Sequence, residues 1–193
     1  MTTTLGKLSP SITKMIRTDH THVLLTFHKF EVDTSPQRKQ GIVNTACLAL
    51  EVHAQLEEEI FYPALQAVAA DNPALQKARP EHDEMKRLIA ELRGLTPEEE
   101  AFDTTFRELM RGVLHHVADE ETIMLPAAER LLKDQLGELG ARMTKRRLEL
   151  AGPRVGEIAG NTVRAMPAGG LLMAGSVLAG GYLLKRAFDQ RRH

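Results

Sequence analysis

One eleven-residue pattern occurs twice in this chain and constrains its fold more than any other feature. Residues 53–63 read HAQLEEEIFYP and residues 116–126 read HVADEETIMLP, so both fit HxxxEExIxxP. A histidine that follows an acidic residue lies 33 positions before the first copy, at His20, and 34 positions before the second, at His82. The matching intervals predict two copies of one helical hairpin.

Capping residues followed by proline divide the first 136 residues into four helix-length segments. Serine, threonine and asparagine are good helix caps, and proline is tolerated in the first helical turn. The segments run from Ser9 to about Glu31, from Ser35 to about Ala70, from Asn72 to about Leu92 and from Thr96 to about Leu136. Short links make consecutive helices antiparallel, and a 4% aromatic content disfavours strands. We therefore predict an all-α, up-down-up-down four-helix bundle.

The repeated HxxxE spacing places a histidine and a carboxylate on one helix face. Residues four apart in an α-helix lie one above the other, so His53 and Glu57 point the same way, as do His116 and Glu120. Packing the two hairpins around a pseudo-twofold axis would add the remaining two histidines to these pairs. We predict a metal site in the bundle interior with six ligands: His20, His53, Glu57, His82, His116 and Glu120.

The donor types indicate which metals fit. Four imidazoles and two carboxylates exceed the needs of one zinc ion, whereas nitrogen and oxygen donors without thiolate suit a pair of iron or manganese ions. The single cysteine, Cys47, excludes a cysteine-rich zinc site and an intramolecular disulfide. It fits a reducing compartment, and with no basic and apolar leader at the N-terminus we expect a cytoplasmic protein.

Several neighbouring residues leave alternatives open. Glu58 and Glu121 follow the predicted carboxylate ligands and either hold the ligands in place, lie at the surface or replace their neighbours. Tyr62 is near the His53 face by helix phase and either packs in the core or approaches the metals. Pro63 and its counterpart Pro126 are expected to kink or end the metal-bearing helices.

Charge divides the chain at about residue 136. Residues 1–136, with the predicted bundle at 9–136, carry 15 basic and 22 acidic groups, whereas residues 137–193 carry 10 and 4. The near-neutral total argues against nucleic acid as a partner. Residues 137–193 are expected to form a separate Gly- and Arg-rich helical tail, with an apolar helix at 166–184. That helix predicts either membrane association or self-association.

The duplicated pattern resembles the hemerythrin family, in particular the bacterial hemerythrin-like HHE cation-binding domains. The likeness covers about residues 9 to 136 and rests on the two HxxxE pairs, the two acid-preceded histidines and the paired prolines. It implies a non-haem di-iron centre with a bridging oxo or hydroxo group, held by the six residues named above. It also implies that the ligand is a small molecule such as dioxygen, hydrogen peroxide or nitric oxide.

One departure bears on function. Oxygen-carrying hemerythrins have a further histidine four residues from the third-helix ligand, where this chain has Ala78 and Lys86. The resemblance is therefore to the four-histidine, two-glutamate variant, for which it implies peroxide or nitric-oxide chemistry besides dioxygen binding. Three functions stay open: a di-iron protein that binds or reduces a small oxidant, an iron or oxygen sensor or iron-storage bundle without turnover, and a metal-free interaction bundle.

Overall fold

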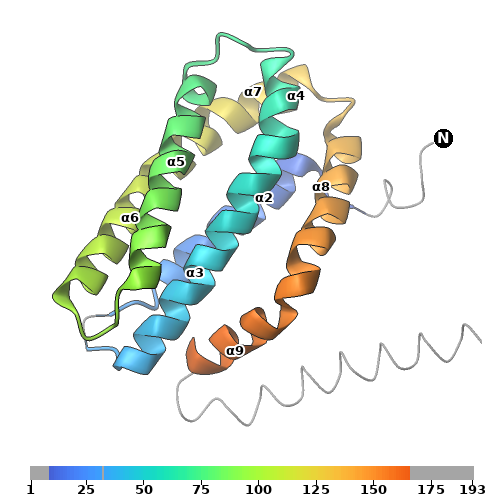
Figure 1. The fold of residues 1–193 in the computed structure, drawn as a ribbon. Coiled ribbons are helices and arrows are strands. Elements are labelled where there is room, and N and C mark those ends of the chain that lie inside the picture. Colours follow the sequence, from blue (N-terminus) through green and yellow to red (C-terminus); the bar gives the residue numbers. More distant parts are fainter. Residues whose placement is uncertain (1–8, 32, 166–193) are drawn as a thin grey trace, which may run out of the picture.

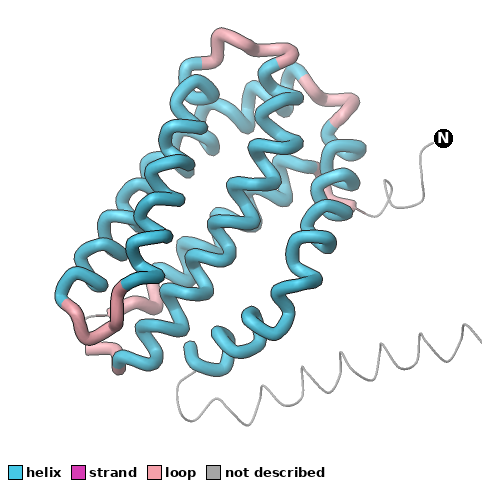
Figure 2. Tube along the Cα trace, viewed as in Figure 1, coloured by secondary structure: helices cyan, strands magenta, loops and turns pink. Residues whose placement is uncertain are grey.

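The computed structural model describes residues 9–31 and 33–165, and all the regular structure within these ranges is helical (Figure 2). The predicted all-α class is confirmed. The first run is α2 (Ile12–Phe27). The second run joins α3 (Pro36–Leu56), the π-helical turn η1 (Glu57–Phe61) and α4 (Tyr62–Gln66).

The second hairpin repeats this organisation. It joins α5 (Pro73–Gly94) to a run made of α6 (Glu100–Asp119), the π-helical turn η2 (Glu120–Met124) and α7 (Leu125–Leu131). Consecutive runs alternate in direction (Figure 1), as the short links predict. A π-helical turn therefore occupies the same place in both hairpins, starting at the predicted carboxylate ligand.

The paired prolines do not end the metal-bearing helices. Pro63 and Pro126 each follow a π-helical turn, and the chain then continues as α-helix for several residues. An interior proline lacks an N–H and its ring presses on the carbonyl four residues earlier, and a wider turn relieves both constraints. Pro80 likewise lies inside α5, which runs through it.

Two helices begin later than the capping pattern predicts. The cap of α2 is Ser11, whose hydroxyl accepts a hydrogen bond from the Lys14 backbone N–H at 3.3 Å, rather than Ser9. The cap of α6 is Glu99, whose carboxylate accepts a hydrogen bond from the Thr96 N–H at 2.7 Å. The charged side chain thus satisfies the backbone donor at Thr96, and the helix starts four residues after it.

Two apolar clusters fill the bundle, one towards each end. The first cluster contains Ile16, Leu56 and Phe61. The second contains Phe102 and Phe106 together with other side chains from α2, α3, α5 and α6. In each of the four helical runs the predicted ligand histidine falls between the two clusters in sequence, so the bundle carries a polar layer between two apolar ones.

The chain continues past residue 136 with further helices. These are α8 (Leu136–Ala151), a 3₁₀ turn η3 (Gly152–Arg154) and α9 (Val155–Ala165). The helix α8 lies beside the first hairpin, on the side away from α5 (Figure 1), and contacts α2 and α3, while α9 contacts α3. We expected a tail separate from the bundle, and its described part packs against the bundle.

Two glycines allow this packing. A Cβ at Gly140 of α8 would lie 2.0 Å from the Pro10 carbonyl oxygen, and one at Gly41 of α3 would lie 2.6 Å from the Ala165 nitrogen. Arginines add ion pairs to the acidic bundle, including Arg146 with Glu59. The predicted apolar helix at 166–184 lies outside the described residues. Of the helices that are described, none has the length and apolar character needed to cross a membrane.

Candidate metal site

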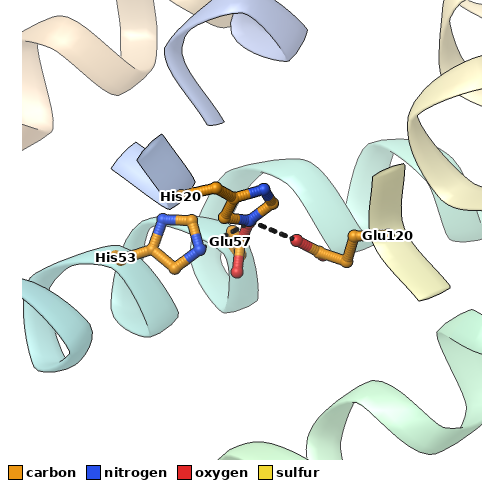
Figure 3. Close-up of side chains that lie close together, drawn as sticks. All are labelled: His20, His53, Glu57 and Glu120. Atoms are coloured by element: carbon orange, nitrogen blue, oxygen red, sulfur yellow. Dashed lines mark hydrogen bonds and ion pairs between the residues drawn. The ribbon is translucent and has the colours of Figure 1, made fainter. Parts of the chain in front are cut away.

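The structure brings all six predicted ligands together in the polar layer of the bundle. None of them exposes more than 6% of its surface, and Glu57, His82 and Glu120 are completely buried. Figure 3 shows four of these side chains converging from α2, α3, η1 and η2. These carboxylates and imidazoles lie far from water, where uncompensated polar groups are very costly.

The six residues form two overlapping donor groups. One group consists of His20, His53, Glu57 and Glu120, and the other of Glu57, His82 and His116. Within each group the candidate ligand atoms lie within 4.8 Å of one another. Glu57 belongs to both groups: its Oε1 lies 3.2 Å from His53 Nε2 and its Oε2 lies 3.5 Å from His82 Nε2. The other carboxylate, Glu120, lies 3.1 Å from His20 Nε2 and 3.7 Å from His116 Nε2.

Unsatisfied atoms at the centre of the layer fit a cation. His53 Nε2 and Glu57 Oε1 are 3.2 Å apart, yet neither has a hydrogen-bond partner with acceptable geometry. The Nε2 atoms of His82 and His116 face each other at 3.1 Å. Lone pairs that face one another in a buried space repel unless a proton or a cation lies between them. The donor set therefore fits a pair of metal ions, with no cysteine in either group.

Each ligand histidine turns its other ring nitrogen outward to an acidic side chain. The Nδ1-to-oxygen distances are 2.9 Å for His20 and Glu121, 2.9 Å for His82 and Glu58, 2.8 Å for His116 and Glu81, and 3.3 Å for His53 and Asp19. An N–H donated from Nδ1 fixes the ring orientation and leaves the Nε2 lone pair free for a metal. This arrangement is typical of metal-binding histidines.

These contacts support one of the alternatives that the sequence left open for two glutamates, which is that they hold the ligands in place. Glu58 and Glu121 contact a ligand histidine of another helix and belong to neither donor group. The matching role of Asp19 and Glu81 was missed, although the sequence contained its signal. In both hairpins an acidic residue directly precedes a ligand histidine, and each acid reaches the histidine of the next helix.

Tyr62 lies inside the site rather than only in the apolar core. Its hydroxyl is 3.1 Å from Glu120 Oε1, 3.1 Å from His82 Nε2 and 3.3 Å from Glu57 Oε2. One O–H proton can serve only one of these acceptors at a time. Burial, together with the nearby carboxylates, raises the pKa of Tyr62 well above its usual value, so the phenol stays protonated and acts as a donor.

The pKa values of the two central carboxylates are shifted in opposite directions. Burial and the neighbouring charge of Glu120 raise the pKa of Glu57 well above its usual value. Burial opposes ionisation of Glu120 as well, but the hydrogen bond from His20 and the charges of the other histidines outweigh it and lower its pKa to about 2. Carboxylates this close resist simultaneous ionisation, and bound cations would remove that conflict.

Burial also favours the neutral form of two ligand histidines. It lowers the pKa of His53, and together with the charge of His116 it lowers the pKa of His82 to about 4. A neutral imidazole is the form that ligates metal. The other histidines of the described chain, His22, His28 and His115, are exposed and lie outside both donor groups. The structure thus places His116, which the repeat alignment selected, in a donor group and leaves His115 exposed.

A small enclosed cavity borders the histidines. Its volume is about 10 Å³, measured as the space open to the centre of a water-sized sphere, so it holds one molecule of about that size. Three of the predicted ligands line it, and the rest of the lining is apolar: Val23, Leu50, Ala54, Met85, Val113 and Val117. The cavity therefore suits a small molecule of low polarity.

A helical bundle with a buried layer of histidines and carboxylates on facing helices defines a metal-binding bundle protein. The Hemerythrin HHE cation binding domain family matches residues 11–128, and the chain belongs to this family. The predicted family is thereby confirmed, while the identity and number of the metal ions belong to the proposal below.

The chain is also similar to two known proteins. A DNA nickase from Nostoc sp. strain PCC 7120 is 29% identical over 132 residues, which cover 68% of this chain and 37% of the nickase. The chain thus spans about a third of that relative. The crystal structure of a hemerythrin HHE cation binding domain-containing protein from Mycobacterium kansasii superposes with a TM-score of 0.65 at 20% identity. It covers 81% of this chain and 99% of the other, and shows the same fold.

Proposed function

We propose that this protein is a non-haem di-iron protein that binds or reacts with a small oxidant such as dioxygen, hydrogen peroxide or nitric oxide. The observation that carries the proposal is the pair of donor groups that share Glu57, next to a cavity for one small molecule. The six residues that would hold the iron ions are His20, His53, Glu57, His82, His116 and Glu120. When bound, two iron ions supply redox chemistry and an open position for the ligand.

The protein's own groups prepare the site for that chemistry. The four acids that contact the histidine Nδ1 atoms are Asp19, Glu58, Glu81 and Glu121, and we call them the outward acids. They hold the four imidazoles with Nε2 facing inward, so little reorganisation is needed when metal binds. Tyr62 offers one O–H to the oxygens and nitrogens at the centre. The apolar cluster residues above and below exclude water, which favours a weakly polar ligand over bulk solvent.

Iron analysis combined with optical spectra tests the proposal. The full-length protein is loaded with ferrous iron without air, and spectra are recorded before and after air and then peroxide. We expect two iron ions per chain and a new absorption band after oxidation, with His53→Ala losing iron and the exposed Glu59→Ala retaining it. A wild-type protein that binds no iron, or whose spectrum stays unchanged with every oxidant, would contradict it.

A second function, sensing of iron or oxygen or storage of iron, is favoured by one contact. Arg147 of α8 holds Asp19, which contacts the ligand His53, so the site is connected to the helix beyond the second hairpin. Sensing predicts little turnover of peroxide but a change in protease cleavage after residue 136 when iron binds. Rapid turnover with an unchanged cleavage pattern would favour an enzyme that reduces peroxide or nitric oxide.

The partners and location of the chain stay predictions. Membrane association or self-association through 166–184, and the expected cytoplasmic location, are tested by fractionating full-length protein without detergent. Recovery in the soluble fraction would exclude stable membrane attachment. DNA nicking is not proposed for this chain, because it spans 37% of the nickase and its 25 basic groups are offset by 26 acidic ones.

A further inference from the structure

A cleft of about 270 Å³ lies between the first hairpin and the helices α8 and α9. We call it the side cleft. Most of its wall is apolar and comes from Val23, Leu48, Ala49, Val52, Ala151 and Ile158. The side cleft is many times larger than the enclosed cavity beside the histidines. It opens where α8 and α9 cover the bundle. The side cleft is therefore a hollow that the duplicated hairpins alone would not form.

The side cleft and the enclosed cavity share two lining residues. Val23 and His53 contribute to both, so one layer of side chains separates the outer hollow from the place beside the ligand histidines. A valine side chain is short and has few atoms to displace. The shortest path from the side cleft to the site thus passes Val23 along the face of a ligand imidazole.

The charged part of the side cleft is electrically balanced. Asp19 and Arg147 both line it, and the Arg147 guanidinium binds the Asp19 carboxylate through both of its terminal nitrogens. A neutral molecule crossing this region displaces no unpaired charge. An ion would have to compete with the pair or lose its hydration in the apolar part, which is costly.

A second hollow reaches the site from another direction. This hollow, of about 420 Å³, is lined by Tyr62, Pro63, Gln66, Leu75, Gln76 and Arg79. It shares no lining residue with the enclosed cavity, and half of its lining residues are polar or charged. It leads to the Tyr62 side of the carboxylates, not to the apolar space beside the histidines.

We propose that the side cleft is the entrance through which small neutral molecules of low polarity, the class of dioxygen and nitric oxide, reach the enclosed cavity. The inference rests on the proposed function for the identity of the final binding site. What the inference adds is the route, which runs along the apolar walls formed by α3, α8 and α9 and then past Val23. The cover formed by α8 and α9 thereby selects neutral molecules over ions.

Two tryptophan variants test the route on the iron-loaded full chain. Ala49→Trp fills the side cleft from an exposed position, and Gln66→Trp places the same ring at the second hollow, also from an exposed position. The chain has no natural tryptophan, so the fluorescence of the new ring reports whether each variant is folded. The probe is nitric oxide, and stopped-flow absorbance gives its association and dissociation rates.

A blocked entrance slows entering and leaving by the same factor. We expect Ala49→Trp to lower both rates about tenfold and to leave the dissociation constant within about twofold, while Gln66→Trp leaves both rates unchanged. Unchanged rates in Ala49→Trp, or equal slowing in Gln66→Trp, would overturn the proposal. A changed dissociation constant without slower association would also overturn it, because it would indicate contact with the bound ligand.

A metal-free measurement separates the route from the proposed function. Xenon binds apolar cavities, and methyl NMR of the metal-free chain under xenon pressure reports which side chains it touches. We expect shifted methyl signals from Val23, Leu48 and Val52, and their loss in Ala49→Trp. The absence of these shifts in the wild-type chain would overturn the route. If the chain binds no iron, the proposed function fails while the xenon result still tests the entrance.

Discussion

The two hairpins carry the same ligands but have different surroundings. In the second hairpin, Glu81 contacts His116 at 2.8 Å and, among the described residues, has no Lys or Arg within 4.0 Å. In the first, Asp19 contacts His53 at 3.3 Å and is also held by Arg147. A carboxylate that is shared with a guanidinium is a weaker acceptor for the imidazole. The fifth helix α8 therefore breaks a symmetry that the duplicated sequence implies.

The other outward acids do not differ in this way. Glu121 is paired with Arg17 at 3.3 Å and Glu58 with Lys86 at 2.7 Å, so each hairpin has one such cation. The hairpins therefore differ at one pair of equivalent acids: Asp19 is bound by an arginine and, within the described part of the chain, Glu81 is not. The comparison teaches that the identity of the candidate ligands follows from the repeat, whereas the contacts that hold these histidines in place depend in part on a helix outside it.

The largest effect is expected from Glu57, which both donor groups share. Glu57→Ala should release both metal ions, and the loss of metal-linked stability should lower the free energy of unfolding by about 2.7 kcal/mol for each ion at metal concentrations of roughly 100 Kd. Metal content and thermal unfolding measure this. Glu59→Ala on the same turn is the control. Retention of one ion in Glu57→Ala would show that the two positions are independent.

The outward acids should show the asymmetry directly. Removing a carboxylate that orients a ligand histidine typically weakens metal binding about 10- to 100-fold. We expect Glu81→Gln to reach this range and Asp19→Asn to cost less, because Arg147 already draws on Asp19. Equilibrium metal titration with Co²⁺ compares the two. Equal losses would mean that the contact with α8 has no influence on the site.

A smaller effect on metal affinity is expected from Arg147, which contacts Asp19. Arg147→Gln removes a positive charge and frees Asp19 for His53, so metal binding should tighten by about three- to tenfold. Arg146→Gln removes the neighbouring charge, which pairs with Glu59 away from the histidines, and should leave affinity unchanged. In an Asp19→Asn background the gain should vanish, since the arginine acts through that carboxylate. Weaker binding in Arg147→Gln would reverse the assigned role.

The smallest effect on the metal site is expected from the cover over the first hairpin, where the substitutions change stability instead. In Gly41→Ala the new methyl would meet backbone of α9 at 2.6 Å, which should cost about 1–3 kcal/mol of stability. In the second hairpin, Gly112 of α6 has no atom within 4 Å of a built Cβ, and Gly112→Ala should stabilise by about 0.5–1 kcal/mol. Chemical denaturation measures both. Two changes of the same sign would contradict the different packing of the hairpins.

Much of the fold could be predicted because its signals are local. Caps, prolines and the duplicated spacing predicted the helices and their class, and the HxxxE interval predicted which side chains converge. The π-helical turns at Glu57 and Glu120 were not predicted, since the prolines indicated only that the hydrogen-bond ladder is disturbed. The roles of Asp19 and Glu81 were missed because each acid contacts a histidine on a different helix.

The sequence by itself determined the class of fold, the family and the set of six side chains that gather, because helix periodicity and an internal repeat are properties of order along the chain. Only the tertiary structure decided which acid holds which histidine, that Tyr62 faces the carboxylates, and that α8 places Arg147 on one half of the site. Those contacts join residues up to 128 positions apart. The sequence marks Asp19 and Glu81 by their place before a ligand histidine, but which histidine each acid reaches depends on how the helices pack.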